Sequence, residues 1–118
     1  MTVRKFPPIR PLSLAVAAAV LVLPPATPAA AAPKVHTIVI DKMKFGPVPA
    51  GIRSGDTVIW VNRDFLKHTA TARDKSFNLV LPPRTSGKTV IRHSGTIAFY
   101  CIYHPGMTGS LNVAKSSG

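Results

Sequence analysis

The stretch Thr57-Val58-Ile59-Trp60-Val61 decides the fold class of this chain. All five residues are β-branched or aromatic, and these residue types are enriched in strands. The turn residues Gly55-Asp56 come directly before the stretch, and a polar, loop-like segment, residues 62–68, follows it. A short apolar run bounded in this way predicts a well-buried strand rather than a helix.

Similar short stretches lie on both sides of this strand, separated by Pro, Gly and other turn residues. The apolar residues after Ala32 do not repeat with the period of a helix in any stretch long enough to form one. The further strands that we expect are residues 35–40, 69–73, 77–81, 85–92, 96–101 and 110–113, with residues 41–45 continuing the first strand after a kink. Seven to eight short strands separated by turns predict an all-β protein with a β-sandwich or a barrel.

The composition excludes several classes of protein. Hydrophobic residues make up 46% and charged residues 16% of the 118 residues, which excludes a chain that is disordered because of its charge. A single cysteine, Cys101, excludes an internal disulfide framework and a zinc site built from several thiolates. The 15 Lys and Arg residues outnumber the four acidic residues, but they are scattered and are not interleaved with aromatic residues. We therefore expect no nucleic-acid partner.

The N-terminal segment has the pattern of a secretory signal peptide. Its parts, in order, are the basic residues Arg4, Lys5 and Arg10, the apolar run 12–23, and the small residues Ala29, Ala30 and Ala31. The last three satisfy the Ala-x-Ala cleavage pattern, and the apolar run is too short to span a bilayer. We expect residues 1–31 to be removed after Ala31 and residues 32–118 to form one periplasmic or secreted domain without a membrane span.

The residues that carry chemistry lie near the C-terminus, in Cys101-Ile102-Tyr103-His104-Pro105-Gly106-Met107. A lone cysteine at the end of an apolar strand is usually a small buried hydrophobic residue. A histidine three residues later and a methionine six residues later coincide with a cysteine by chance only rarely. Thiolate, imidazole and thioether together suit copper, whereas thioether is not a normal zinc ligand. The motif therefore predicts a copper site.

A blue-copper centre needs a second histidine, because two imidazoles and one thiolate surround the metal while a methionine binds weakly on the axis. The candidates are His36, His68 and His93. His68 follows the polar segment and opens a new strand 33 residues before Cys101, so the chain can cross a sandwich and return. We predict that one copper ion is held by His68, Cys101, His104 and Met107, and that His36 and His93 are solvated.

These stretches resemble the small cupredoxins of the amicyanin, pseudoazurin and plastocyanin group. The resemblance rests on Gly55-Asp56-Thr57-Val58, Trp60-Val61-Asn62, His68, Gly95-Thr96, Tyr100-Cys101, His104-Pro105, Met107 and Gly109, and it covers residues 35–114. The two-residue gaps of the Cys-His-Met loop are typical of amicyanin. The resemblance implies an eight-stranded Greek-key sandwich with a type 1 copper that moves one electron. It also implies that the electron leaves through His104, within an apolar patch to which we assign Tyr103, Pro105 and Leu66.

The chain departs from this group at one position beside the predicted site. Many relatives have Asn directly after the upstream histidine, where it ties the two ligand loops together, and this chain has Thr69. The threonine hydroxyl can make a similar tie, and its backbone N–H can still reach the thiolate. We therefore expect copper binding to persist, while the rigidity and the reduction potential of the site depend on how Thr69 replaces the asparagine.

The function predicted from the sequence is that of an exported one-electron carrier between redox proteins, and not of an enzyme. A nucleophilic enzyme using Cys101 and His104 would need a third, orienting group, and none is evident. The alternative is a periplasmic copper carrier or resistance protein with the same site, but Met43 is the only other methionine after the leader. We expect a monomer whose basic residues Arg63, Lys67, Arg73 and Lys75 steer redox partners with acidic docking surfaces.

Overall fold

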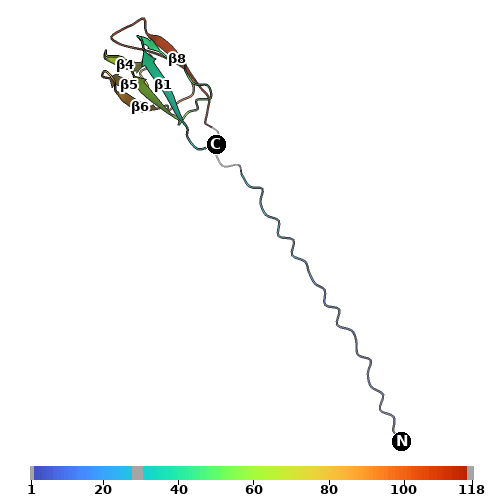
Figure 1. The fold of residues 1–118 in the computed structure, drawn as a ribbon. Coiled ribbons are helices and arrows are strands. Elements are labelled where there is room, and N and C mark those ends of the chain that lie inside the picture. The colour runs from blue at the N-terminus through green and yellow to red at the C-terminus, as the bar shows by residue number, and fades with distance from the viewer. Residues whose placement is uncertain (1, 28–30, 117–118) are drawn as a thin grey trace.

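Two four-stranded sheets face each other in the computed structural model, which describes residues 2–27 and 31–116 (Figure 1). The strands are β1 (Val35–Asp41), β2 (Lys44–Phe45), β3 (Thr57–Asn62), β4 (His68–Ala72), β5 (Asn78–Leu81), β6 (Ser86–Val90), β7 (Gly95–Tyr100) and β8 (Thr108–Val113). The order is β2-β1-β3-β6 in one sheet and β5-β4-β7-β8 in the other. The prediction of an all-β sandwich of seven to eight strands is confirmed.

The pairing of the strands gives the sandwich two distinct ends. β1 and β3 are parallel and begin together, with Val35 beside Thr57, at the end where β6 and β8 finish. The chain enters β1 at this end, which we call the leader end. β1, β3 and β7 finish at the opposite end, where β4 and β8 begin. We call it the cysteine end, because Cys101 directly follows β7 there.

An aromatic cluster between the sheets forms the centre of the core. Trp60 from β3 and Phe99 from β7 are fully buried, with ring centroids 5.0 Å apart in an edge-on arrangement. Phe45 packs on Phe99 at 4.8 Å, and Phe77 lies 5.7 Å from Trp60. Edge-on aromatic pairs at these separations stabilise a core beyond the area that they bury. Trp60, Phe77 and Phe99 belong to the buried core, and the partly buried Phe45 packs against it.

One strand prediction is wrong, because residues 41–45 do not continue β1 after a kink. The chain reverses at Lys42 and Met43, and β2 pairs antiparallel with β1, with Ile40 beside Phe45. Both turn residues have a positive φ, 52° and 63°, which non-glycine residues rarely adopt. Asp64 accepts hydrogen bonds from the backbone N–H groups of both, at 2.8 and 3.0 Å. This contact stabilises the turn from a distant part of the sequence.

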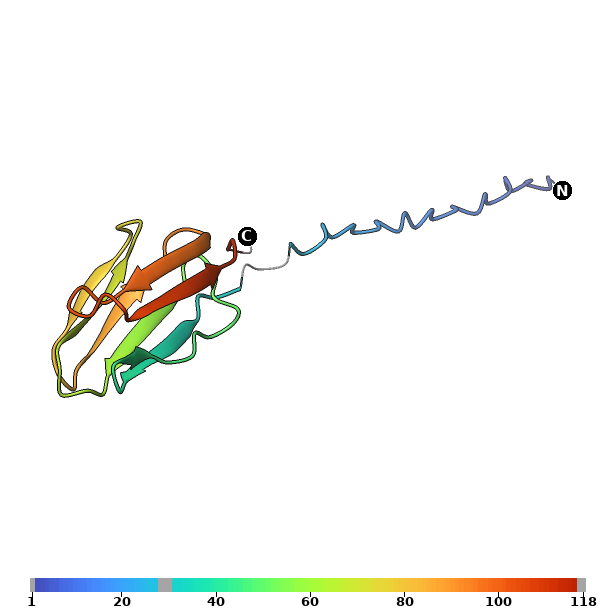
Figure 2. The ribbon, with the colours of Figure 1, turned by 90° about the horizontal axis from the view of Figure 1, so that it is seen from above.

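The leader lies apart from the sandwich in both ribbon views (Figures 1 and 2). Residues 2–27 form neither helix nor strand, and their side chains are exposed. Within the described ranges the structure contains no helix that is long and apolar enough to cross a membrane. The predicted cleavage after Ala31 involves Ala29 and Ala30, which lie outside the described residues, so cleavage remains a prediction.

Candidate metal centre

The four predicted ligand residues lie at the cysteine end of the sandwich. His68 is the first residue of β4, Cys101 directly follows β7, and Met107 directly precedes β8. His104 lies in the connection between them. His68 and Cys101 are fully buried and Met107 is 6% exposed, whereas His104 is half-buried. The two strands that begin here and the strand that ends here therefore bring a distant histidine to the Cys-His-Met loop.

Three donor atoms converge between these side chains. Cys101 Sγ lies 3.8 Å from His68 Nδ1 and 3.6 Å from His104 Nδ1, and the three donors lie within 4.8 Å of one another. With metal bonds of about 2.0 Å to nitrogen and 2.3 Å to sulfur, a trigonal ion separates the two donors by about 3.7 Å. The observed separations match this value. The thiolate and two imidazoles suit copper, so these residues could hold one copper ion.

Backbone hydrogen bonds close the loop that carries three of the four residues. The N–H of His104 donates to the carbonyl of Cys101 at 3.3 Å, and the N–H of Met107 donates to the carbonyl of His104 at 2.8 Å. The N–H of Cys101 in turn donates to the carbonyl of Met107 at 3.1 Å. The loop is therefore a tight turn with its own bonding. It brings Met107 to the same end of the core as the donor atoms of Cys101 and His104.

Asp64 orients the imidazole of His68. Its Oδ2 lies 2.8 Å from His68 Nε2. Burial opposes ionisation of Asp64, but hydrogen bonds from Met43 N–H, His68 and Lys42 N–H outweigh it and lower the pKa of the carboxyl. An ionised carboxylate only accepts hydrogen bonds, so Nε2 carries the ring proton and Nδ1 presents its lone pair beside the thiolate. Our sequence analysis missed this role, although a carboxylate four residues before a candidate ligand was a visible signal.

Thr69 ties the two ligand segments together, as the sequence analysis anticipated. Its backbone N–H donates to Cys101 Sγ at 3.3 Å, and its hydroxyl oxygen accepts a hydrogen bond from Ile102 N–H at 2.9 Å. Thr69 Oγ1 also lies 2.9 Å from Thr71 Oγ1, which lies 2.9 Å from Asn78 Oδ1. Each hydroxyl has only one proton to donate. Thr71 therefore donates to the side-chain carbonyl oxygen of Asn78, and Thr69 donates to the hydroxyl oxygen of Thr71. The hydroxyl is thus anchored on both sides.

No family model matches the chain, and no curated protein matches its sequence. Solved structures do match. A variant of amicyanin in its Cu(I) form superposes with a TM-score of 0.60 at 24% identity, over 67% of this chain and 81% of that one. The Cu(I) form of another amicyanin variant gives 0.60 at 25% identity, over 70% and 85%. Amicyanin from Paracoccus versutus (Thiobacillus versutus) gives 0.57 at 24% identity, over 67% and 80%.

This chain has the cupredoxin fold of amicyanin. The resemblance that the sequence indicated is therefore confirmed by structure. At this level of identity the likeness establishes the fold. The chemistry of the site depends on the residues that the cupredoxin sandwich brings together in this chain.

The other two histidines, His36 and His93, lie away from the candidate copper site. His93 is about half exposed, as predicted, and its Nε2 lies 3.0 Å from Asp74 Oδ2. The prediction that His36 is solvated is wrong, because its side chain is only 10% exposed and its Nε2 lies 2.8 Å from Asp56 Oδ2. The parallel pairing of β1 and β3 brings these two residues together at the leader end. Neither histidine is near Cys101.

Exposed apolar side chains lie in the two segments that carry His68 and His104, which is half-buried. The predicted patch members Leu66 and Tyr103 are 51% and 48% exposed, and Pro105 is also exposed. The structure adds Phe65 and Ile102, which the sequence analysis left out. We call these five residues the apolar patch. Two side-chain cations lie over its rings, Lys67 Nζ at 4.9 Å from the Tyr103 centroid and Arg84 at 4.3 Å from that of Phe65.

Only part of the predicted basic rim lies at this end. Arg63 and Lys67 belong to the connection between β3 and β4, beside the apolar patch. β4 then carries the chain away, and Arg73 and Lys75 lie beyond its far end, with Arg73 4.5 Å from the ring centroid of Tyr100. Arg84, which precedes β6, takes their place near the site. The rim is therefore formed by Arg63, Lys67 and Arg84.

Proposed function

We propose that this protein is an exported type 1 copper protein that carries single electrons between redox proteins. His68, Cys101 and His104 would be the equatorial ligands, and Met107 the weak axial one. The observation that carries the proposal is the convergence of two imidazole Nδ1 atoms on one buried thiol, 3.8 and 3.6 Å away. This donor set, with a methionine at the same end of the core, is typical of blue-copper centres.

The bound copper would supply a one-electron couple between Cu(I) and Cu(II). The chain's own residues hold the donors at nearly fixed positions, so little movement would be needed when the oxidation state changes. Asp64 fixes the orientation of His68, Thr69 ties its segment to the cysteine loop, and the loop closes on itself through backbone bonds. Burial of His68 and Cys101 excludes water from the site.

The same rigidity argues against the alternative, a copper carrier or resistance protein. A protein that delivers copper needs ligands that a partner can reach and exchange, and Cu(I) favours several thioethers. Here two of the proposed ligands are fully buried. Met43, the only other methionine after the leader, lies in the β1–β2 turn. These features support electron transfer.

The proposed route for the electron is the edge of His104, which lies amid the apolar patch. An apolar contact surface permits close approach without ordered water, and the rim of Arg63, Lys67 and Arg84 would attract an acidic redox partner. We further propose that the leader directs export and is removed after Ala31, so that the domain acts as a monomer in the periplasm or outside the cell.

The test that separates electron transfer from copper delivery is redox cycling in the presence of a chelator. The copper-loaded protein is reduced with ascorbate and reoxidised with ferricyanide while a strong Cu(I) chelator is present. An electron carrier retains its copper through repeated cycles. Transfer of the metal to the chelator on the first reduction would instead support the carrier.

The ligand assignment is tested with histidine variants. His68→Ala should lose the native spectrum and recover much of it on addition of imidazole, which can enter the vacated position. His93→Ala is the matched control and should keep the native spectrum, because its side chain is about half exposed and bonded to Asp74. A native spectrum in His68→Ala, or its loss in His93→Ala, would show that the assignment is wrong.

A further inference from the structure

The leader end of the sandwich carries a second basic surface, separate from the rim around the candidate copper site. It is formed where β1 and β3 begin and β6 and β8 finish, and its charged members are Lys34, Arg53, Arg92 and Lys115. All four are exposed. A bridge between Arg53 and Ala114 joins the segment before β3 to the segment after β8 at this end. We call this group the leader-end surface.

The acidic groups nearby do not cancel this charge. Asp56 is 4% exposed, and its oxygens accept hydrogen bonds from Lys34 N–H, Arg53 N–H and His36. These hydrogen bonds stabilise the carboxylate, whose single negative charge stands against four exposed cations. Asp74 is exposed, but it bonds His93 and lies between Arg73 and Lys75 in the chain. The leader-end surface therefore presents net positive charge to the solvent.

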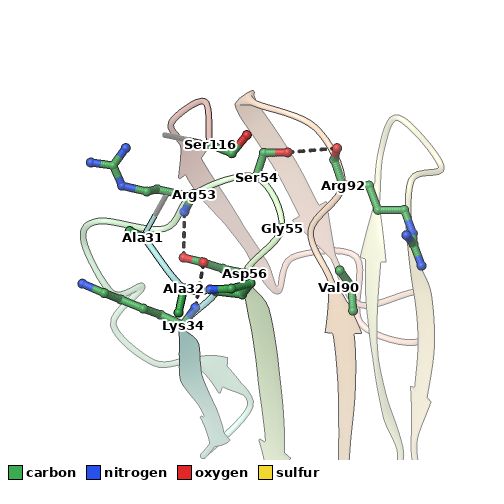
Figure 3. Close-up of a pocket in the computed structure, with 11 residues that line it drawn as sticks. Ala31, Ala32, Lys34, Arg53, Ser54, Gly55, Asp56, Val90, Arg92 and Ser116 are labelled. Atoms are coloured by element: carbon green, nitrogen blue, oxygen red, sulfur yellow. Dashed lines mark hydrogen bonds between the residues drawn. The ribbon is translucent and has the colours of Figure 1, made fainter. Parts of the chain in front are cut away.

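The directions of the side chains indicate what kind of anion fits. A hollow of about 700 Å³ lies among these residues, but Arg53 and Arg92 point away from each other on its two sides, and Lys34 points away from Arg92 (Figure 3). A small anion needs donors that converge on it. Guanidinium and ammonium groups that spread outward instead suit an extended anionic surface.

The course of the chain points to the same surface. The apolar run 12–23 is separated from Lys34 by residues 24–33, which can reach at most about 35 Å when extended. While that run is in a membrane, the leader end is the part of the sandwich closest to it. The six residues of β3 separate the two ends by about 20 Å. This is about twice the Debye length at physiological salt, so the two basic surfaces act independently.

We infer that the leader-end surface binds the anionic headgroups of a phospholipid membrane and holds the sandwich with its cysteine end facing away from the bilayer. The inference rests on the proposed export, which brings the leader end to a membrane. Binding is electrostatic and reversible, because residues 35–116 offer charge at this end and no lipid-inserting helix. Such an orientation would leave His104 and the apolar patch open to soluble redox partners.

The experiment measures cosedimentation with lipid vesicles, using the chain without residues 1–31 so that the leader's own lipid affinity is absent. This truncation removes no core residue, because every buried core side chain lies between Ile38 and Val113. Vesicles of phosphatidylcholine containing phosphatidylglycerol should bind the protein, and pure phosphatidylcholine should not. The bound fraction should fall as salt is added. The metal-free protein can be used, so the result does not depend on whether the proposed copper ligands are correct.

Charge reversal locates the binding surface. Arg92→Glu with Lys115→Glu should weaken binding to the anionic vesicles about tenfold or more. The matched control, Arg63→Glu with Arg84→Glu, makes the same change of net charge at the cysteine end and should bind nearly as well as the unaltered domain. Paramagnetic headgroup lipids should broaden the amide signals of Ser54 and Lys115 and spare those of Gly106 and Met107.

Any of four results would overturn the inference. The first three are equal binding to neutral and anionic vesicles, an equal loss of binding in both double variants, and broadening confined to the cysteine end. The third would mean that the apolar patch, and not the leader-end surface, meets the lipid. Absence of vesicle binding would also reject a membrane partner, and it would favour a soluble acidic protein as the partner of the leader-end surface.

Discussion

Thr69 makes two of the contacts that hold the candidate ligands in register. Its N–H reaches the thiol of Cys101, and its hydroxyl accepts the hydrogen bond from Ile102 N–H. The hydroxyl contact is the only one of the two that depends on the side chain. A substitution at this residue can therefore remove the side-chain hydrogen bond to Ile102 N–H while it keeps the backbone hydrogen bond to the sulfur of Cys101.

We predict that Thr69→Val destabilises the metal-free protein by about 1–3 kcal/mol, because it leaves the partly buried N–H of Ile102 without its acceptor while keeping the side-chain shape. Thr69→Ser keeps a hydroxyl and should retain most of the stability. Denaturant unfolding of the two variants measures the difference. In the copper-loaded protein, Thr69→Val should also shift the reduction potential. Equal stability of the Val and Ser variants would show that the hydroxyl tie contributes little.

The close packing of β8 against β7 depends on Gly109. A Cβ at Gly109 would come within 2.3 Å of the Phe99 ring, and Phe99 pairs with Gly109 across the two strands. The ring fills the space that a side chain would need. Glycine is required here for close approach, and its φ is not positive.

Gly109→Ala should therefore displace the Phe99 ring and destabilise the fold by about 1–3 kcal/mol. Thermal unfolding measures the loss. Gly106→Ala is the matched control in the same segment, because nothing lies within 4 Å of a Cβ at that position. Destabilisation of the Gly106 variant by as much as the Gly109 variant would mean that loop flexibility, and not the Phe99 contact, determines the effect.

Asp56 joins the starts of β1 and β3 and makes the fold sensitive to acid. Burial opposes its ionisation, but hydrogen bonds from Lys34, His36 and Arg53 outweigh burial and lower its pKa from 3.8 to about 2. A carboxylate whose pKa is lower in the folded state stabilises the fold above its unfolded pKa. That contribution is lost as pH falls through about 2.

The free energy of unfolding should therefore decrease as the pH is lowered from about 5 to about 2. Asp56→Asn should be less stable at neutral pH and should show a smaller fall. Some decline should persist in this variant, because Asp64 and Asp74 also have lowered pKa values. A variant with the same acid sensitivity as the original protein would contradict the role given to Asp56.

The elements that the sequence predicts well are those whose signals are local. The strands around Trp60 and before Cys101 show β-branched and aromatic runs, and their bounds agree with β3 and β7 to within one residue. The β1–β2 reversal was missed because Asp64, 22 residues away from Lys42, stabilises a turn without glycine. His36 was misjudged for the same reason, since its partner Asp56 arrives only through strand pairing. Contacts between distant segments leave no local pattern.

The candidate site was more predictable than these contacts, because three of its four residues lie on one short loop. Cys101, His104 and Met107 keep their spacing whatever the rest of the chain does. His68 had to be chosen among three histidines, and the deciding signals were the polar loop before it and the 33 residues that separate it from Cys101. Asp64 was overlooked because its role depends on which face His68 presents to the core.

At the scale of the whole molecule, charge is concentrated at both ends of the sandwich. The rim of Arg63, Lys67 and Arg84 lies beside the apolar patch and should steer an acidic redox partner. We predict that the bimolecular electron-transfer rate with an acidic partner falls as ionic strength rises. Arg63→Glu with Lys67→Glu should lower the rate by roughly tenfold or more at low salt, with little change in reduction potential.

The control for this prediction changes charge away from the rim. Arg73→Glu with Lys75→Glu makes the same change of net charge beyond the far end of β4 and should reduce the rate much less. Stopped-flow kinetics over a range of salt concentrations measures both variants. A rate that is indifferent to salt, or an equal loss in the two variants, would mean that the rim does not guide docking.

We propose that His68, Cys101, His104 and Met107 together hold copper in a type 1 site. The most direct test of this proposal adds copper(II) to the purified protein and records the visible and EPR spectra. We expect one copper per chain, an intense blue thiolate-to-copper band and narrow hyperfine splitting, and we expect the band and the narrow splitting to be absent in Cys101→Ala. A colourless protein, or one that binds only copper(I), would contradict the proposal.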